Sequence, residues 1–465
     1  VGGLANQLAA HMDIENPEHQ DKVQRFWQSP TIANKQGDKA IDMFDKLASG
    51  DIKAVWIMAT NPVVSLPNRD KIIAALKKCE LVVVSDCVEK NDTLAFADVK
   101  LPATPWLEKN GTVTNSERRI SRQRNAVLPA GQAKHDWQII QDVATKMGFS
   151  GFDFDEVSDV FKEHAQLTQF ENNGERLLDL SGLSQLTTKE YNELAPIQWP
   201  VNESYPEGCA RVYANGKFNT PSGKAQLIAV TPQLPKQRTS VEFPFVLNSG
   251  RLRDQWHTMT RTGKTSKLSK HTDKPYLYLH PSDAQALAVQ NDDMLSIAAS
   301  TGQAIAHVKL DTKQRIGECF MPIHWNKSFA SNANVSSLYQ GIVDPLSGQA
   351  ESKQGAVALR KKNFQQYISV HITSNVSLTA DFWVKSTTAY GDSYQVALDE
   401  PSRDALLWCQ QTSGLLGEWL TFYQEDNEYI ICLQAGKLVF LAYFSASWPE
   451  IEQAWLEHVF SEEKL

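Results

Sequence analysis

Two short apolar runs separated by a segment with helical spacing constrain the fold of this chain more than any other feature. Residues 53–59 (KAVWIMA) are apolar without a helical period and end at Thr60-Asn61-Pro62. Residues 68–79 place apolar side chains at helical spacing, and a second run from Leu81 is rich in β-branched residues and ends at Ser85-Asp86. Strand, helix and strand in this order predict a βαβ unit with a right-handed crossover.

Polar residues follow both predicted strands. Because ligands of parallel sheets bind beyond the carboxyl ends of the strands, we expect Thr60-Asn61 and Ser85-Asp86 on the same rim. The Asp86 carboxylate can accept two parallel N–H bonds from a guanine edge, and a turn or helix N-cap aspartate is the alternative interpretation. Lys109, followed by Asn110-Gly111, is a second candidate contact for an anion, with a surface turn as its alternative.

The pattern divides the chain into four parts. Residues 1–150 are expected to form an α/β domain that is incomplete at its N-terminus, because the first residues already read as the middle of a helix. Residues 151–235 break often at Pro, Gly and Asn and are expected to form a connector with a helix near 155–166. Residues 236–365 are expected to form a β-barrel, and residues 366–465 a small acidic α+β region to which we assign no chemistry.

The barrel prediction depends on regularly spaced short β runs. The runs are FPFVLNSG, PYLYLH, MLSIAAS, AIAHVKL and CFMPIHW, and polar turns separate them. Such spacing is typical of a β-barrel or sandwich. The segment PSDAQAL predicts one short helix over 281–287, with Ser282 or Asp283 as its N-cap.

Charge and cysteine content limit the function classes. The net charge of −8 argues against a nucleic-acid binder, and the acids concentrate in residues 390–465. The six cysteines lie far apart without metal-ligand spacing, which is typical of free thiols in a reducing compartment. No run of about 18 apolar residues and no secretion signal occurs, so we expect a cytoplasmic protein without a membrane partner.

The densest basic cluster lies in residues 249–271, directly after a predicted strand. It contains Arg251, Arg253 and four further bases against the single acid Asp254. Backbone amides and an arginine fork after a strand suit phosphate or another anion, and a solvated basic loop is the alternative. His324 follows another predicted strand, and we assign it no metal role. No catalytic triad, Walker loop or GxGxxG motif is present.

Several motifs in this order resemble one enzyme superfamily. They are ATNPVVSLPN, VVVSDC, ADVKLPATPWLEKNGTVTNSERRISRQR, HDW, SGRLRDQWHTMTRTG, LHPSDAQAL, FMPIHWN and DPLSGQAESK. Together they resemble the molybdopterin oxidoreductases of the dimethyl sulfoxide reductase superfamily over roughly residues 1–365, and within it the assimilatory nitrate reductases. The motifs TNSERRISRQR and GRLRDQWHTMTRTG are specific in combination.

The resemblance implies a cofactor and its contacts. The family binds one molybdenum between two molybdopterin guanine dinucleotides, and a [4Fe-4S] cluster lies near the N-terminus. One set of implied contacts is Asn61, Ser85, Asp86, Lys109 and Asp136. A second set is Ser249, Gly250, Arg251, Trp256, His257, Thr258, Asn334 and Lys353, with Arg251, Trp256 and His257 at the pterin end. No catalytic residue or metal ligand is assigned, because the family's ligand and cluster cysteines correspond to positions upstream of Val1.

The resemblance also implies an activity. It is the two-electron reduction of nitrate to nitrite in nitrate assimilation, with ferredoxin, flavodoxin or an NADH-linked reductase as electron donor. The chain would be the C-terminal part of such an enzyme and inactive alone. A formate dehydrogenase of the same superfamily is one alternative. A metal-free structural relative, like the large subunit of respiratory complex I, is another, although the long HTMTRTG loop argues against it.

Overall fold

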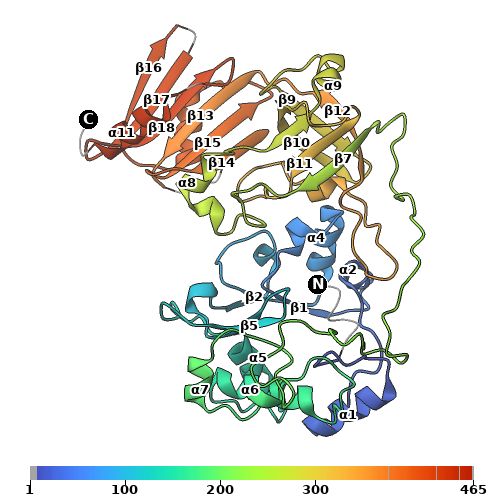
Figure 1. Cartoon of the computed structure of the whole chain (residues 1–465). Helices are drawn as coiled ribbons and strands as arrows, with labels where there is room; N and C mark the ends of the chain where they lie inside the picture. Colours follow the sequence, from blue (N-terminus) through green and yellow to red (C-terminus); the bar gives the residue numbers. More distant parts are fainter. Residues whose placement is uncertain (1–7, 375, 377, 426, 450, 463–465) are drawn as a thin grey trace.

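The computed structural model describes residues 8–374, 376, 378–425, 427–449 and 451–462. These residues form two lobes joined by a long extended segment (Figure 1). The first lobe holds two small sheets with their helices, and the second holds a barrel and a larger sheet. Short 3₁₀ helices lie at η2 (Leu94–Phe96), η3 (Trp106–Glu108), η4 (Ser181–Leu183), η5 (Thr262–Lys264) and η6 (Val335–Leu338).

The predicted βαβ unit is confirmed. A parallel sheet with the order β1-β2-β3 is formed by β1 (Ala54–Met58), β2 (Leu81–Asp86) and β3 (Val99–Pro102). Helix α4 (Arg69–Lys78) connects the first two strands, and α2 (Ala40–Ser49) and the one-turn α3 (Pro62–Ser65) pack nearby. Met58 of β1 pairs with Ser85 of β2. Thr60, just after β1, and Asp86, at the end of β2, therefore lie at the same rim of the sheet.

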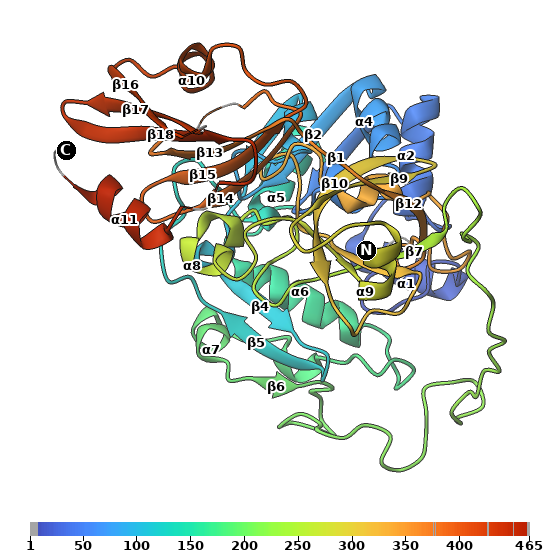
Figure 2. The same cartoon turned by 90° about the horizontal axis from the view of Figure 1, so that it is seen from above.

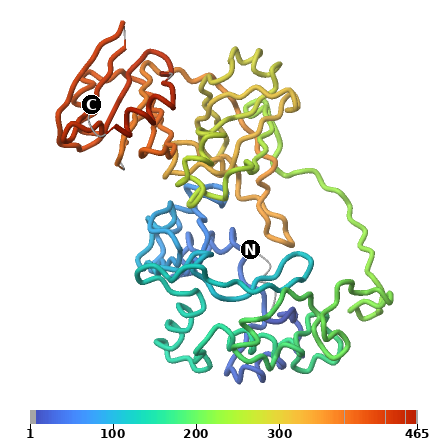
Figure 3. The backbone as a smooth tube through the Cα atoms, turned by 60° about the vertical axis from the view of Figure 1, so that its left-hand side comes forward, coloured from blue at the N-terminus to red at the C-terminus, as the bar shows by residue number. Residues whose placement is uncertain are grey.

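A second, antiparallel sheet completes the first lobe. It has the order β4-β5-β6 and consists of β4 (Gly111–Thr114), β5 (Arg119–Gln123) and β6 (Ile197–Gln198). Its helices are α1 (Pro17–Trp27), α5 (Asp136–Lys146), α6 (Val157–Gln169) and α7 (Thr188–Glu193). Part of the expected connector therefore packs here, because Phe161 and Tyr191 share a core with Ile120 of β5. Residues 210–244 contain no helix or strand and form the extended segment between the lobes (Figure 3).

Residues 245–361 form a closed six-stranded barrel with the order β10-β8-β11-β7-β12-β9. The strands are β7 (Phe245–Gly250), β8 (Tyr276–Leu279), β9 (Met294–Ala299), β10 (Gly302–Leu310), β11 (Glu318–Pro322) and β12 (Gly355–Lys361). Five of them are the predicted runs, and β12 was not predicted. Fully buried Leu247, Leu277 and Leu295 fill the interior. The barrel prediction is thus confirmed.

The short helix predicted after β8 exists as α9 (Pro281–Ala286), but its predicted N-cap is wrong. His280 caps the helix, because its Nδ1 accepts a hydrogen bond from the Ser282 amide at 3.1 Å. Pro281 occupies the first turn, where its missing N–H is not needed. Asp283 is instead buried and accepts a hydrogen bond from the Gly317 amide at 2.8 Å.

The C-terminal region is a six-stranded antiparallel sheet with the order β14-β15-β13-β18-β17-β16. Its strands are β13 (Gln366–Ile372), β14 (Phe382–Thr387), β15 (Asp392–Leu398), β16 (Glu418–Gln424), β17 (Asn427–Gln434) and β18 (Lys437–Ser445). Helix α10 (Ala405–Ser413) packs on one face, α11 (Gln453–Ser461) packs against β18, and α8 (Ser266–Ser269) lies beside β14 (Figure 2).

The cysteines and the helices bear on two further expectations, free thiols and the absence of a membrane span. None of the six cysteines is in a disulfide, in agreement with the free thiols expected from their spacing. Among the described residues, no helix combines the length and apolar character needed to cross a membrane.

The barrel interior gives a stability prediction. Leu295→Ala should lower the free energy of unfolding by about 2–5 kcal/mol, because it leaves a cavity in a fully buried core. Leu346→Ala, at a side chain that is 83% exposed, should change it by less than about 0.5 kcal/mol. Urea unfolding of both variants measures the difference. Equal effects would show that the barrel interior does not determine stability.

Candidate functional site

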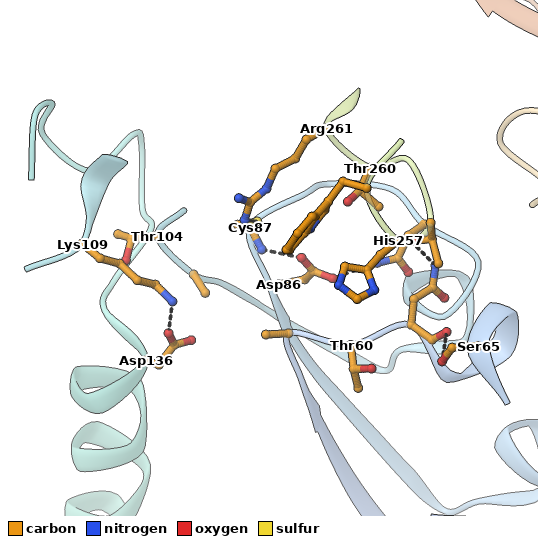
Figure 4. A pocket seen from close by; sticks show the side chains of 16 residues that line it. Thr60, Ser65, Asp86, Cys87, Thr104, Lys109, Asp136, His257, Thr260 and Arg261 are labelled. Atoms are coloured by element: carbon orange, nitrogen blue, oxygen red, sulfur yellow. Dashed lines mark hydrogen bonds and ion pairs between the residues drawn. The ribbon is translucent and has the colours of Figure 1, made fainter. Parts of the chain in front are cut away.

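A pocket of about 230 Å³ lies where the rim of the parallel sheet meets the loop that follows β7 (Figure 4). We call this loop, residues 251–261, the barrel loop. The sheet contributes Thr60, Asn61 and Asp86, and the barrel contributes the segment from Trp256 to Arg261. Pockets for whole small-molecule ligands usually measure about 300–1,000 Å³, so this one accommodates part of a larger ligand. The two predicted groups of residues therefore meet, at least in part, in one place.

Asp86 presents a carboxylate to this pocket. One oxygen accepts a hydrogen bond from the Cys87 amide at 2.6 Å, and the other accepts one from Asn91 Nδ2 at 2.9 Å. Burial raises the pKa of Asp86, and hydrogen bonding from Cys87, Val88 and Asn91 opposes the rise. A ligand that donates N–H bonds to this carboxylate would share its oxygens with these groups.

Asn61 and Ser85 occupy different positions relative to the pocket. The Asn61 side chain accepts a hydrogen bond from Thr93 Oγ1 at 2.7 Å and donates one to Thr258 Oγ1 at 3.4 Å, which links the sheet to the barrel loop. Ser85 is fully buried, and its hydroxyl accepts a hydrogen bond from Trp56 Nε1 at 2.7 Å. Ser85 therefore lies beneath the rim, and its contact with a ligand stays a prediction.

Lys109 and Asp136 face each other at the opposite side of the pocket and form an ion pair (Figure 4). Asp136 is the first residue of α5, where the helix dipole favours a negative charge. Each side chain is about one-third exposed, so a ligand can reach both. An anion can bind to the Lys109 ammonium, and a ligand with a hydrogen-bond donor can bind to the Asp136 carboxylate.

The barrel loop is held by two side chains that follow β11. Buried His324 accepts a hydrogen bond from the Leu252 amide at Nε2 (2.8 Å) and donates from Nδ1 to the His257 carbonyl (2.7 Å). Asn326 Nδ2 donates to the Thr258 carbonyl at 2.6 Å. These directions require a neutral imidazole with its proton on Nδ1, and burial lowers the pKa of His324 accordingly. Neither His324 nor Asn326 was expected from the sequence to hold this loop in place.

Arg251 carries a charge without a counterion. Within the described residues it has no hydrogen bond or ion pair, and it lies close enough to His257, His324 and Lys353 for its charge to lower the pKa of each. For all three groups burial is the larger cause of the lowered pKa. Arg251 and Lys353, neither of which is paired with a carboxylate among the described residues, create a positive potential that suits an anion.

The end of β7 is fixed by contacts of Ser249 and Gly250 with neighbouring strands and loops. Ser249 is buried and donates from Oγ to the Ser352 carbonyl at 2.7 Å, and the Lys353 ammonium donates to the Ser249 carbonyl. A Cβ at Gly250 would lie 2.8 Å from Cε2 of Phe320, so no larger residue fits without movement of that ring. These contacts fix the strand end from which Arg251 projects.

Asn334 lies in a separate pocket of about 210 Å³, together with Arg69 and Lys327. Its Oδ1 accepts hydrogen bonds from Ser336 N at 2.9 Å and Ser336 Oγ at 2.6 Å. Its buried Nδ2 has no partner among the described residues. The amide can therefore donate to a ligand, but the structure does not bring Asn334 together with the residues of the first pocket.

These residues suit a nucleotide and not a metal ion. The described part of the chain contains no group of three or more His, Cys, Asp or Glu side chains that could hold a metal. An arginine without a counterion, a carboxylate that lines a pocket and an unpaired amide are the groups that bind a diphosphate and a base.

Two protein-family models match the chain. The first, described as "Molybdopterin oxidoreductase", matches residues 3–146, and the second, "Molydopterin dinucleotide binding domain", matches residues 245–356. The chain belongs to the molybdopterin oxidoreductases. The two matched ranges contain the two walls of the first pocket.

Individual relatives agree with this family. A nitrate reductase of Klebsiella oxytoca is 39% identical over 465 residues, which are 99% of this chain and 52% of that protein. The F420-dependent formate dehydrogenase subunit alpha of Methanocaldococcus jannaschii is 29% identical over 363 residues, 78% of this chain and 50% of that protein. The chain thus spans about half the length of the curated relatives it matches.

A solved structure shares the fold. The acetylene hydratase from Pelobacter acetylenicus matches 74% of this chain and 49% of that chain, with a TM-score of 0.55 and 19% sequence identity. At this identity the similarity concerns the architecture alone.

The His324 contacts predict a pH-dependent loop. Because the folded-state pKa of His324 lies below 6.5, the stability from its neutral form is present above pH 6.5 and is lost as the pH falls below that value. Protonation at Nε2 removes the acceptor for the Leu252 amide. Amide hydrogen exchange, corrected for intrinsic rates, should show lower protection of Leu252 at about pH 5 than at about pH 7.5.

His324→Gln tests the cause of this dependence. Glutamine can replace both the donor and the acceptor but does not titrate, so the protection of Leu252 should vary less with pH. The control His458→Gln, at an exposed position on α11, should keep the dependence of the unmodified protein. An unchanged pH dependence in His324→Gln would contradict the assignment.

Proposed function

We propose that this chain is the cofactor-binding C-terminal part of a molybdenum nitrate reductase that reduces nitrate to nitrite in nitrate assimilation. The observation that carries the proposal is the pocket in which Asp86, from the parallel sheet, faces Trp256, His257 and Arg261 of the barrel loop. The 39% identity to a nitrate reductase across almost the whole chain supports nitrate as the substrate.

In this proposal the cofactor is a molybdenum with two molybdopterin guanine dinucleotides. Asp86 accepts the two N–H bonds of a guanine edge, and Lys109 and Asp136 contact the same dinucleotide. Lys353 holds a phosphate oxygen, while Arg251, Trp256 and His257 border the pterin end. Asn334, with its unpaired Nδ2 in the separate pocket, supports a second cradle. Each contact is an expectation from chemistry and position.

The metal group, when bound, supplies two-electron oxygen-atom transfer from nitrate. The residues of this chain bind and orient the pterins, and the loop fixed by His324 keeps Trp256 and His257 at the mouth of the pocket. Electrons come, in this proposal, from a [4Fe-4S] cluster that is supplied in turn by a ferredoxin, a flavodoxin or an NADH-linked reductase.

A formate dehydrogenase is the second candidate, because a relative of that name is 29% identical over 78% of the chain. The test is an assay of the intact protein, purified with its cofactor, for nitrate reduction with a reduced viologen and for formate oxidation with an oxidised viologen. We expect nitrite formation and no formate oxidation. Formate oxidation without nitrite formation would replace the proposal by the second candidate.

Asp86 gives a test of the guanine contact. Asp86→Asn in the intact protein should lower its content of guanine nucleotide, released by acid hydrolysis, because the amide turns one acceptor into a donor that faces the base. A loss of roughly tenfold in cofactor affinity is expected from one unsatisfied buried contact. Asp51→Asn, at an exposed loop position, is the matched control and should keep full content. Full content in Asp86→Asn would remove Asp86 from the site.

A further inference from the structure

A larger cavity of about 630 Å³ lies in the C-terminal region, outside the cofactor pockets. Its floor is one face of β13, β14 and β15, and its walls are the α8 segment, which lies beside β14, and α11, which packs against β18 (Figures 1 and 2). This volume falls within the range of about 300–1,000 Å³ that is usual for small-molecule sites. No part of the proposed function uses this cavity.

The floor of the cavity is polar, although α8 and α11 lie over this face of the sheet. Successive side chains of a strand point to opposite faces, and Ile368, Val370 and Ile372 of β13 pack into the apolar core on the other side. The intervening Ser369 and His371 line the cavity. Strand pairing places Ser386, Ser393 and His371 in one cross-strand row, and Val384, Gln395 and Ser369 in the next.

One polar atom of this floor has no partner. The Oε1 atom of Gln395 is shielded from solvent and accepts no hydrogen bond from the described residues. An unsatisfied buried acceptor is unfavourable, and a rotation of the Gln395 side chain toward the cavity would let a ligand N–H or O–H group satisfy it. The neighbouring His371 is 3% exposed and is hydrogen-bonded at both ring nitrogens, to Ser369 Oγ and Tyr390 OH, each at 2.8 Å.

The floor carries no charge, and the rim carries no free cation. Burial lowers the pKa of His371 to about 3, so its ring is neutral at physiological pH. Lys270, the one Lys or Arg among the described lining residues, is paired with Glu457 at 3.4 Å, and Asp273 also lines the cavity. An anionic ligand would therefore meet more negative than positive charge.

The wall opposite the floor is partly apolar. The exposed Ala454 of α11 contributes to this wall, together with the half-buried Pro449 and Ile451 that precede the helix. A ligand that fits both sides needs a hydrogen-bonding edge for the floor and an apolar face for the helix. A polyol lacks the apolar face, and a hydrocarbon lacks the donor for Gln395.

We propose that this cavity binds a nucleoside, an uncharged molecule whose base has an apolar face and a hydrogen-bonding edge. The base donates an N–H to Gln395 Oε1 and lies against α11, while the ribose hydroxyls contact the serine and threonine side chains of the floor and of α8. One hydrogen bond links the edge of the cavity to the segment that follows the barrel loop, from Thr387 Oγ1 to the Gly263 carbonyl at 2.7 Å.

The test is isothermal titration of the protein with adenosine, guanosine, cytidine and uridine. At least one should bind with a stoichiometry near one per chain, and its 5′-monophosphate should bind more weakly because Asp273 and Glu457 repel the phosphate. Gln395→Leu should weaken binding of the nucleoside about tenfold or more, since the acceptor is lost. The same change should not lower the unfolding midpoint, because it removes an unsatisfied polar atom.

Two further variants make the test specific. Gln411→Leu, on α10 at the other face of the sheet, is the matched control and should bind normally. Ser386→Val replaces a second floor residue by a β-branched residue, which suits a strand. Binding by this variant decides the test if Gln395→Leu does not fold. Absence of binding by all four nucleosides, or binding unchanged in both floor variants, would overturn the proposal. Guanosine bound in the Asp86 pocket would be insensitive to Gln395, so the two sites are distinguishable.

Discussion

The two hydrogen bonds of His324 are the interaction on which the geometry of the site depends. They tie Leu252 and His257 of the barrel loop to the segment that follows β11. A neutral imidazole can serve as donor and acceptor at once, and its burial keeps it neutral. Without this tie the segment that carries Arg251 and Trp256 would be a solvated basic loop. With it, the loop is a fixed wall opposite Asp86.

The second requirement is that the two lobes meet in one arrangement. Buried polar contacts between them serve this purpose: the Asn68 amide donates to the carbonyls of Ser336 and Tyr339, and Ser336 Oγ donates to the Val64 carbonyl. Buried polar groups are unfavourable unless paired, so these contacts favour one relative position of sheet and barrel. The Asn61–Thr258 hydrogen bond then closes the pocket at its rim.

Local patterns in the sequence were sufficient for the βαβ unit, for five barrel strands and for the rim position of Asp86, because each depends on side chains close in sequence. The alternation of a strand also implies that Ser85 and Asp86 point to opposite faces, a signal that could have excluded Ser85 from the pocket. The role of His324 depends on groups about 70 residues away and the separate pocket of Asn334 on tertiary packing. Neither leaves a local signal.

In the proposed function, one pterin dinucleotide lies between the parallel sheet and the barrel loop. A structure of the intact protein, purified anaerobically with its cofactor, would show where the dinucleotide binds. We expect a base edge within hydrogen-bond distance of the Asp86 carboxylate and the pterin end beside Arg251, Trp256 and His257. A dinucleotide found elsewhere, with this pocket filled only by water, would refute this placement.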